Sequence, residues 1–216
     1  MISILLATYN GEKYISKSIE SVLNQTYKNF ELLIGFNGTT DNSKEIVKNF
    51  SDPRISVFDF GDEKGKSKTL NKLLKLSSYD LICLQDDDDI WIENKLEKQI
   101  GFVNQFDIVG TQINYINSND EYIGKPNLKT TDEEIKSYSL MGINQVANTS
   151  TIFKKQDALD INGWSDGIDG IEDYDFWLRL MRNGKKFINI SEELVLHRLH
   201  SNSNFNTKKY DLNKIL

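Results

Sequence analysis

The chain has 216 residues, which is enough for one sizeable α/β domain. Hydrophobic residues make up 38% of it and charged residues 27%, a balance typical of globular proteins and not of disordered chains. The net charge of -6 disfavours nucleic acid as a partner, because nucleic-acid binders use an excess of positive charge.

Cysteine usage and hydropathy restrict the cellular setting. The single cysteine, Cys83, excludes an internal disulfide and fits a reducing compartment. It lies in an apolar run, where a free thiol is usually buried and inert. Residues 1–7 carry no basic leader, and no apolar stretch approaches the ~20 residues that cross a bilayer. We therefore expect a cytoplasmic protein, with at most peripheral contact at the inner face of the membrane.

The first half of the chain alternates strand-like apolar runs with segments of helical periodicity. Strands are predicted over residues 2–7, 30–34, 55–60 and 108–110, with a further one from residue 81. Between these runs, apolar residues recur at helical spacing. This rhythm predicts a doubly wound, mostly parallel, Rossmann-like sheet.

Two short patterns predict how helices begin. Asn42 followed by Glu45, and Thr131 followed by Glu134, both resemble the capping box, in which the first residue and the residue three positions later satisfy free backbone N–H groups. Each pair therefore predicts the start of a short helix.

After about residue 112 the alternation becomes irregular. Residues 114–127 are polar and rich in turn formers, which indicates a hairpin. Residues 149–153 have the composition of an edge strand. The second half is therefore expected to be smaller and less regular than the first.

The most informative stretch is Leu81–Trp91, where an apolar run leads into four consecutive aspartates and hydrophobicity then resumes. Adjacent carboxylates repel one another unless they are solvated or bound by a cation. One interpretation is a solvated turn in which Asp89 caps the next helix. The apolar flanks favour another, because open α/β sheets bind ligands at the carboxyl ends of their strands. A hard divalent cation, held with substrate phosphates, is the natural occupant.

Two other groups of polar residues have catalytic potential. Glu172 and Asp173 begin an amphipathic helix that ends at Gly184. They either compensate the helix dipole or supply a general base. The two histidines, His197 and His200, follow an apolar run near the end of the chain, and an imidazole there can complete a metal site begun by the aspartates.

Taken in order, these motifs resemble family-two glycosyltransferases of the GT-A fold over nearly the full chain. Each motif is weak alone, but their order and spacing are specific. The matching segments are Thr8-Tyr9-Asn10 with Glu12, Ser21 to Tyr27, Gly38-Thr39-Thr40-Asp41, Asp86 to Trp91, Asn162-Gly163-Trp164, Glu172 to Leu180 and Arg198-Leu199-His200.

The resemblance implies an architecture and an activity. Residues 1–216 would form one GT-A domain, with a nucleotide-sugar-binding half over 1–112 and an acceptor and catalytic-base half over 113–216, of which the tail after about residue 204 is expected to be mobile. The activity would be inverting transfer of a sugar from a nucleotide diphosphate to a polysaccharide, oligosaccharide or glycolipid acceptor.

The resemblance also implies residue roles. Asp88 would be the direct ligand of Mg²⁺ or Mn²⁺, with Asp86 and His200 as further metal contacts. Asp173 would be the general base, and Glu172 the less favoured alternative. The remaining nucleotide contacts would be Thr8, Tyr9, Glu12, Asn37, Asp41, Asp86 and Asp87.

Two departures from the family pattern leave the donor open. Asn37 stands where an aspartate near the nucleobase is usual, so either a UDP-linked or a dTDP-linked donor is compatible. Leu70 stands where the family often has arginine. Lys68 or Lys66 would then supply the missing positive charge, unless both simply belong to a solvated helix face.

Two other functions are compatible with parts of the pattern. A catalytically silent nucleotide-sugar-binding module would explain the altered base-contact loop. A nucleotidyltransferase would also place acidic residues and a metal at a strand end. That class usually needs a glycine- and arginine-rich loop after the first strand, which the segment Thr8–Gly11 does not provide.

Overall fold

The computed structural model describes residues 1–62, 64–168, 170–200 and 215. Its first half is a regular strand–helix alternation, as predicted. The elements are β1 (Ile2–Thr8), α1 (Ile15–Leu23), β2 (Phe30–Phe36), α2 (Ser43–Lys48), β3 (Ile55–Asp59), α3 (Lys66–Leu76) and β4 (Leu81–Gln85).

The second half contains shorter helices and two long strands. Its elements are β5 (Ile90–Trp91), α4 (Lys95–Ile100), β6 (Ile108–Ile116), β7 (Tyr122–Gly124), α5 (Asp132–Leu140), the 3₁₀ helix η1 (Asn148–Ser150), β8 (Ile152–Lys154), α6 (Lys155–Asp160), α7 (Glu172–Arg182) and β9 (Phe187–Arg198). Among the described residues, no helix is both long and apolar enough to traverse a bilayer.

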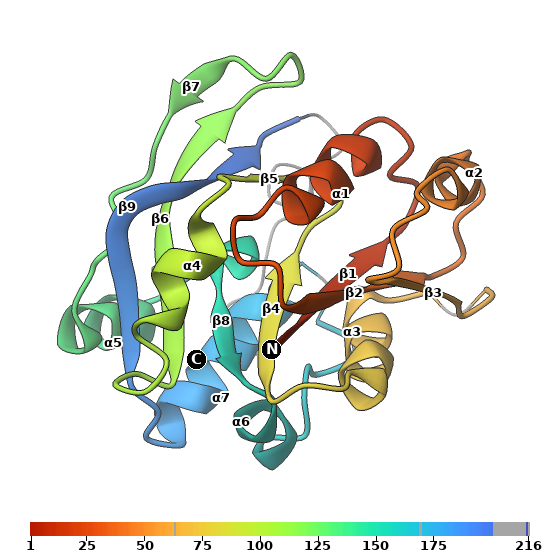
Figure 1. Cartoon of the computed structure of the whole chain (residues 1–216). Coiled ribbons are helices and arrows are strands. Elements are labelled where there is room, and N and C mark those ends of the chain that lie inside the picture. The colour runs from red at the N-terminus through yellow and green to blue at the C-terminus, as the bar shows by residue number, and fades with distance from the viewer. Residues whose placement is uncertain (63, 169, 201–214, 216) are drawn as a thin grey trace.

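All strands belong to one sheet, in the order β3-β2-β1-β4-β8-β6-β9-β5, with β7 paired to β6. The strands β1 to β4 pair in parallel, as do β6 and β9, whereas β8 is antiparallel to both of its neighbours. Figure 1 shows α1 and α4 on the near side of this sheet and α7 on the far side. The predicted boundary at residue 112 lies inside β6, so the sheet continues across it.

Alternation along the strands explains the two-sided core. In β1, Leu5 belongs to the hydrophobic cluster that contains residues of α3 and α7, while Ile4 and Leu6 belong to the cluster that contains residues of α1 and α4. Successive side chains of a strand point to opposite faces, so a strand covered on both faces is apolar throughout. All seven residues of β1 are buried. The central strands that lead to this edge of the sheet are therefore packed by apolar side chains on both faces.

Several predicted elements differ from the structure. Residues 149–153 were expected to contain an edge strand, but β8 lies between β4 and β6 in the middle of the sheet. The strand predicted over 108–110 extends to residue 116, because β9 pairs along its whole length. The predicted tail after about residue 204 lies outside the described residues, apart from residue 215.

One of the two capping boxes is present. Thr131 accepts a hydrogen bond from the backbone N–H of Glu134 and caps α5 as predicted. Asn42 makes no such bond at the start of α2. Instead the neighbouring Asp41 accepts from the backbone N–H and the hydroxyl of Ser43, so the capping box predicted at Asn42 is wrong.

Candidate active site

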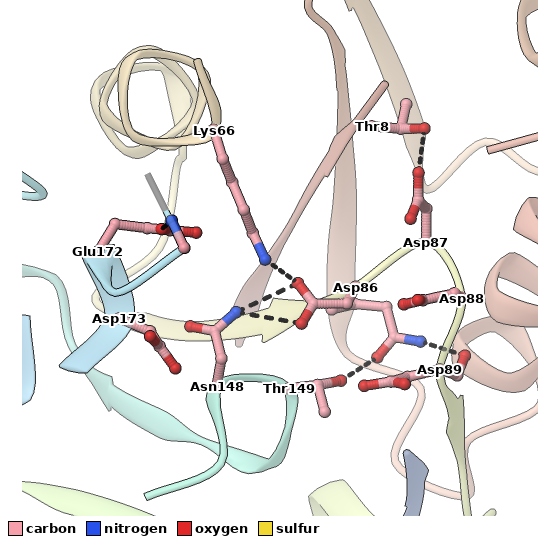
Figure 2. Close-up of polar contacts among 12 residues, drawn as sticks. Thr8, Lys66, Asp86, Asp87, Asp88, Asp89, Asn148, Thr149, Glu172 and Asp173 are labelled. Atoms are coloured by element: carbon pink, nitrogen blue, oxygen red, sulfur yellow. Dashed lines mark hydrogen bonds and ion pairs between the residues drawn. The ribbon is translucent and has the colours of Figure 1, made fainter. Parts of the chain in front are cut away.

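The four aspartates follow β4 immediately, at the carboxyl end of a buried parallel strand, as predicted. They do not behave as one solvated acidic turn. Each of the four carboxylates contacts a different partner. Figure 2 shows the partners of Asp86 and Asp87. These contacts separate the like charges and direct each carboxylate to a different place.

Asp87 contacts the end of the neighbouring strand. The register of β1 on β4 pairs Leu6 with Gln85, so Thr8 lies beside Asp87 and donates its hydroxyl hydrogen to the carboxylate. Burial, together with the charge of Asp88, raises the pKa of Asp87 to about 7. Asp87 therefore links the first loop to the acidic run.

Asp89 is fully buried and points away from the cleft. Its carboxylate lies 2.9 Å from Nδ1 of His197 and accepts from the backbone N–H of Arg198 at 2.8 Å. Burial alone would lower the pKa of His197, but the Asp89 carboxylate outweighs it and raises the pKa to about 9. The interpretation of Asp89 as the cap of the next helix is therefore wrong, since it anchors the end of β9.

We expect Asp89→Asn to destabilise the fold by about 3 kcal/mol near pH 7, because it removes the fully buried counter-charge of the His197 imidazolium. Burial raises the pKa of Asp89 to about 6, and the Asp89 carboxylate raises the pKa of His197 to about 9. Both groups are therefore charged between about pH 6 and pH 9, and the contribution of the imidazolium is lost as pH rises through about 9. Urea unfolding of both proteins at pH 7 and pH 9.5 tests this. A loss that is absent at pH 7, or larger at pH 9.5, would contradict the assignment.

Asp88 and His200 both line the cleft, and their side chains contact each other. Oδ2 of Asp88 lies 2.9 Å from Nε2 of His200. Burial acts to raise the pKa of Asp88, but the hydrogen bond to His200 and the positive charges of His197 and Lys66 outweigh it and lower the pKa. Asp88 is thus held ionised.

The backbone at Asp88 is fixed from beneath by Arg198. This side chain is fully buried and donates from Nε to the Asp88 carbonyl at 2.9 Å. It also donates to the Asn117 carbonyl at 2.8 Å and pairs with Asp120. The guanidinium therefore ties the acidic run to the turn between β6 and β7.

Asp86 is directed to the opposite wall of the cleft. It accepts from Nζ of Lys66 at 2.6 Å and from the side-chain amide of Asn148 at 3.2 Å (Figure 2). Burial would lower the pKa of Lys66, but the charges of Asp86 and Glu172 outweigh it and raise the pKa, so Lys66 remains a cation. The first turn of α3 thus places a fixed positive charge among the carboxylates.

Lys68 was predicted as a nucleotide contact and does not line the cleft. It lies at the outside of α3 and is 3.4 Å from Asp166, with 41% of its side chain exposed. Lys66 and Lys68 are two residues apart and so point to different sides of the helix. Lys66, and not Lys68, thus lies among the cleft residues, and a nucleotide contact by Lys68 stays a prediction.

Glu172 and Asp173 begin α7, as predicted. Glu172 is buried and turned back onto its own loop, where it accepts from the backbone N–H of Gly170. Asp173 is half-buried and lines the cleft. Burial and then the charge of Glu172 raise the pKa of Asp173 to about 7. A carboxylate that takes up a proton near neutral pH is suited to general base catalysis.

The loops after β1 and β2 are joined to each other. Asp41 accepts from the backbone N–H of Glu12 at 2.9 Å, and Glu12 accepts from the backbone and side chain of Asn42 at 3.0 Å. Neither Glu12 nor Asp41 lines the cleft, although both were predicted to contact the nucleotide. Their hydrogen bonds join the two loops, and a nucleotide contact by either residue stays a prediction.

Tyr9 and Asn37, in contrast, line the cleft at the end of these loops. Tyr9 is 49% exposed, and Nζ of Lys64 lies over its ring, 5.8 Å from the centroid. Asn37 is buried, and its Oδ1 has no hydrogen-bond partner among the described residues. A buried acceptor of this kind is suited to an N–H group of a ligand.

These groups surround one cleft of about 1320 Å³. Its lining runs from the loops after β1 and β2, across the acidic run, to η1 and the start of α7. The predicted site residues that line it are Tyr9, Asn37, Asp86, Asp87, Asp88, Glu172, Asp173 and His200. The fold thus gathers segments as far apart in the sequence as Tyr9 and His200 at one edge of the sheet.

The three predicted metal ligands are only partly arranged to bind a divalent cation. Of the three predicted ligands, Asp88 and His200 converge, while Asp86 is turned to Lys66 and Asn148. Within the described ranges, no group of three or more His, Cys, Asp or Glu side chains forms a complete metal site. Mg²⁺ and Mn²⁺ are typically held by one or two protein ligands and completed by water and substrate phosphates, so a carboxylate with an imidazole is compatible with either ion.

Three contributors were not assigned by sequence reasoning. The sequence indicates Lys66 only as an alternative to Lys68, Arg198 only as part of a motif, and Asn148 not at all. Arg198 could have been singled out from the sequence, because a charged residue directly after an apolar strand usually has a partner when it is buried. Asn148 has no local signal, since nothing in the sequence indicates that η1 faces Asp86.

Comparison with known proteins shows similarity to sugar-transferring enzymes. The family model described as "Glycosyl transferase family 2" matches residues 3–158. The O-antigen biosynthesis glycosyltransferase WbnJ of Escherichia coli is 35% identical over 213 residues, covering 94% of this chain and 81% of that protein. The Escherichia coli UDP-Glc:alpha-D-GlcNAc-diphosphoundecaprenol beta-1,3-glucosyltransferase WfgD is 34% identical, covering 97% and 81%.

Solved structures share the fold. TarS 1-349 of S. aureus in complex with UDP-GlcNAc superposes with a TM-score of 0.80 at 17% identity, over 99% of this chain and 63% of that one. A mannosyltransferase of Pyrobaculum calidifontis, in complex with GDP-Man and Mn²⁺, gives a TM-score of 0.73 at 13% identity, over 94% and 58%. The chain thus spans about 60% of these structures. The predicted GT-A fold is confirmed.

Proposed function

Since this chain belongs to glycosyl transferase family 2, we propose that it transfers a sugar from a nucleoside-diphosphate donor to a saccharide acceptor, with inversion at the anomeric carbon. One observation carries the proposal. Asp173, whose pKa is raised to about 7, lines the same cleft as the acidic run at the end of β4. A proton acceptor and a site for an anionic leaving group therefore share one cavity.

Asp173 acts as the general base. Its carboxylate accepts the proton of an acceptor hydroxyl while the hydroxyl oxygen forms a bond to the anomeric carbon. The bond from that carbon to the diphosphate oxygen breaks, and its electron pair leaves with the diphosphate. Attack from the face opposite the leaving group inverts the anomeric configuration. Glu172 serves the base by fixing the loop before α7, because it accepts from the Gly170 N–H.

The leaving diphosphate needs positive charge beside it. Asp88 and His200 would hold Mg²⁺ or Mn²⁺, which supplies electrostatic stabilisation of the departing charge when bound. Lys66 adds a fixed cation from α3, in the region where Leu70 replaces the arginine that the family often has. Asp86, which accepts from Lys66, holds this ammonium group in the cleft.

The donor is proposed to be UDP-linked or dTDP-linked. The unpartnered Oδ1 of Asn37 can accept the N–H of a uracil or thymine ring, and Tyr9 offers a ring to stack on. The names of WfgD, with UDP-Glc, and of the TarS complex, with UDP-GlcNAc, support the uridine choice. The acceptor is proposed to be a saccharide or a lipid-linked saccharide, as the name of WfgD states for that enzyme.

The proposal is tested with a panel of nucleotide sugars, each measured for binding by calorimetry and for hydrolysis with and without Mn²⁺. Metal-dependent release of UDP or dTDP from at least one donor is expected. Binding without turnover, also in the presence of saccharide acceptors, would instead indicate a silent sugar-nucleotide-binding module. Release of pyrophosphate from a nucleoside triphosphate would indicate a nucleotidyltransferase.

The general base should be visible in the pH dependence. Because Asp173 must be ionised to accept a proton and its pKa is about 7, kcat/KM should fall about tenfold per pH unit below pH 7 and reach a plateau above pH 8. Initial rates between pH 5.5 and 9 measure this. Glu172→Gln removes the neighbouring charge that raises the pKa of Asp173, so its midpoint should move to lower pH. A profile that is flat below pH 7 would contradict the role of Asp173.

A further inference from the structure

Asn148 lines the cleft, and the amide nitrogen of its side chain is already hydrogen-bonded. It lies in η1 with 9% of its surface exposed. Its Nδ2 donates to both oxygens of Asp86, at 3.2 and 3.4 Å. Asp86 also accepts from Nζ of Lys66 at 2.6 Å, so its carboxylate oxygens act as acceptors toward both neighbours.

This contact fixes the orientation of the amide. An ionised carboxylate cannot donate a hydrogen bond, so the nitrogen of Asn148 must face Asp86 and the oxygen must face away from it. Oδ1 is buried and has no hydrogen-bond partner within the described part of the chain. Figure 2 shows it pointing away from Asp86, on the side where Glu172 and Asp173 are drawn. A buried acceptor without a partner needs a donor from a ligand.

The backbone beneath Asn148 is rigid. Its carbonyl accepts from the backbone N–H and the hydroxyl of Thr151, which closes the turn of η1. The next residue, Thr149, donates to Gln85 at 2.9 Å and accepts from the indole N–H of Trp91 at 2.9 Å. The free oxygen is therefore held in place by the sheet before any ligand binds, which is the condition for selective recognition.

The position of Asn148 indicates which part of the nucleotide-sugar donor it would contact. In the proposed reaction the diphosphate lies at the acidic run and the acceptor hydroxyl lies at Asp173, so the transferred sugar must lie between them. Asn148 and Asp173 line the same cleft, and Asn148 is bonded to the first aspartate of the run. In the proposed reaction, the free acceptor of Asn148 would therefore lie beside the transferred sugar.

We propose that Asn148 is a specificity-determining residue whose Oδ1 accepts a hydrogen bond from a hydroxyl group of the transferred sugar. The inference rests on the proposed function. Asp86 takes part by holding the amide nitrogen, so that only the acceptor is presented. Sugars that carry a hydroxyl at the matching position are bound, and those that lack it leave a buried oxygen unpaired.

Calorimetry with Asn148→Ala tests the assignment. The probes are UDP alone, the nucleotide sugar that the unmodified protein turns over, and the monodeoxy analogues of that nucleotide sugar. The variant should bind the nucleotide sugar about tenfold more weakly and UDP within twofold of the unmodified protein. For the unmodified protein, one monodeoxy analogue should bind about tenfold more weakly than the parent, and in Asn148→Ala that same deoxygenation should cause no further loss.

Each other outcome has a defined meaning. If Asn148→Ala weakens the binding of UDP and of the nucleotide sugar equally, Asn148 acts only through Asp86 and the proposal is overturned. The proposal is also overturned if deoxygenation of the sugar weakens binding equally in the variant and in the unmodified protein. If the variant does not fold, the analogue series on the unmodified protein still decides, because unchanged binding of every monodeoxy analogue overturns the proposal. Failure of the unmodified protein to bind any nucleotide sugar would overturn the proposed function together with this assignment.

Discussion

Asp173→Asn is expected to lower kcat by about 10³-fold or more while leaving nucleotide binding and stability unchanged. The amide has nearly the shape of the carboxylate but cannot accept the acceptor's proton, and general base catalysis typically contributes 10²–10⁴-fold. The side chain is half-buried at the start of α7, and among the described residues it accepts only from the N–H of Tyr174, so the substitution removes little that holds the fold. Transfer rates, UDP affinity and thermal unfolding give the three readouts.

Glu172→Gln is the matched control for this prediction. The neighbouring carboxylate is buried and accepts from the Gly170 N–H, a bond that the carbonyl of glutamine can still accept. We expect a loss below about tenfold, together with the shift of the pH profile described above. A larger loss for Glu172→Gln than for Asp173→Asn would exchange the roles of the two residues. Near-normal turnover of Asp173→Asn would show that Asp173 is not the general base.

Asp88→Asn is expected to abolish metal-dependent turnover, again by about 10³-fold or more. Asp88 carries the carboxylate that converges with the His200 imidazole, and its pKa is held low by that contact and by nearby positive charge. An amide is a weaker ligand and removes one negative charge. Affinity for UDP in the presence of Mn²⁺ should fall at least tenfold, whereas affinity in the presence of a chelator should change little. Titration of UDP with Mn²⁺ or with chelator separates the two.

The neighbouring Asp89 provides the contrast for Asp88. Asp89→Asn should reduce stability, as stated above, without altering the dependence on Mn²⁺ at temperatures where the fold is intact. The two residues are adjacent in sequence but face different partners, His200 and His197. Near-normal turnover of Asp88→Asn with donor and acceptor would show that the metal role belongs elsewhere.

The sequence by itself determined the architecture of the first half and the place of the site. Strands such as β1 are apolar at every position because the sheet is covered on both faces, and that pattern is local. The acidic run follows β4 directly, so its location at the carboxyl edge of the sheet could be derived from the order of residues alone. The start of α7 at Glu172 was predictable for the same reason, since acids precede a helical apolar face.

The tertiary structure alone decided how the four aspartates divide their contacts. Their partners are 79 residues away for Asp87, 112 for Asp88 and 108 for Asp89, so no window of sequence contains both members of a pair. Four identical residues in a row carry no internal sign of which one faces the cleft. The pairing of β9 with β5, directly after the acidic run, brings both histidines to the run and distinguishes Asp88 from Asp89.

Packing likewise decided three other features. These are which of Lys66 and Lys68 lines the cleft, the central position of β8, and the contact of Asn148 with Asp86. A helical lysine faces inward or outward according to the rotation of α3 on the sheet, and hydrophobic periodicity defines that rotation too coarsely for two residues in the same turn. Strand pairing is set by the shape and burial of the assembled sheet and not by the composition of three residues. The sequence thus determined which chemical groups reach the edge of the sheet, and the tertiary structure decided which of them meet, because hydrogen bonds and ion pairs across the cleft depend on distances that only the folded chain defines.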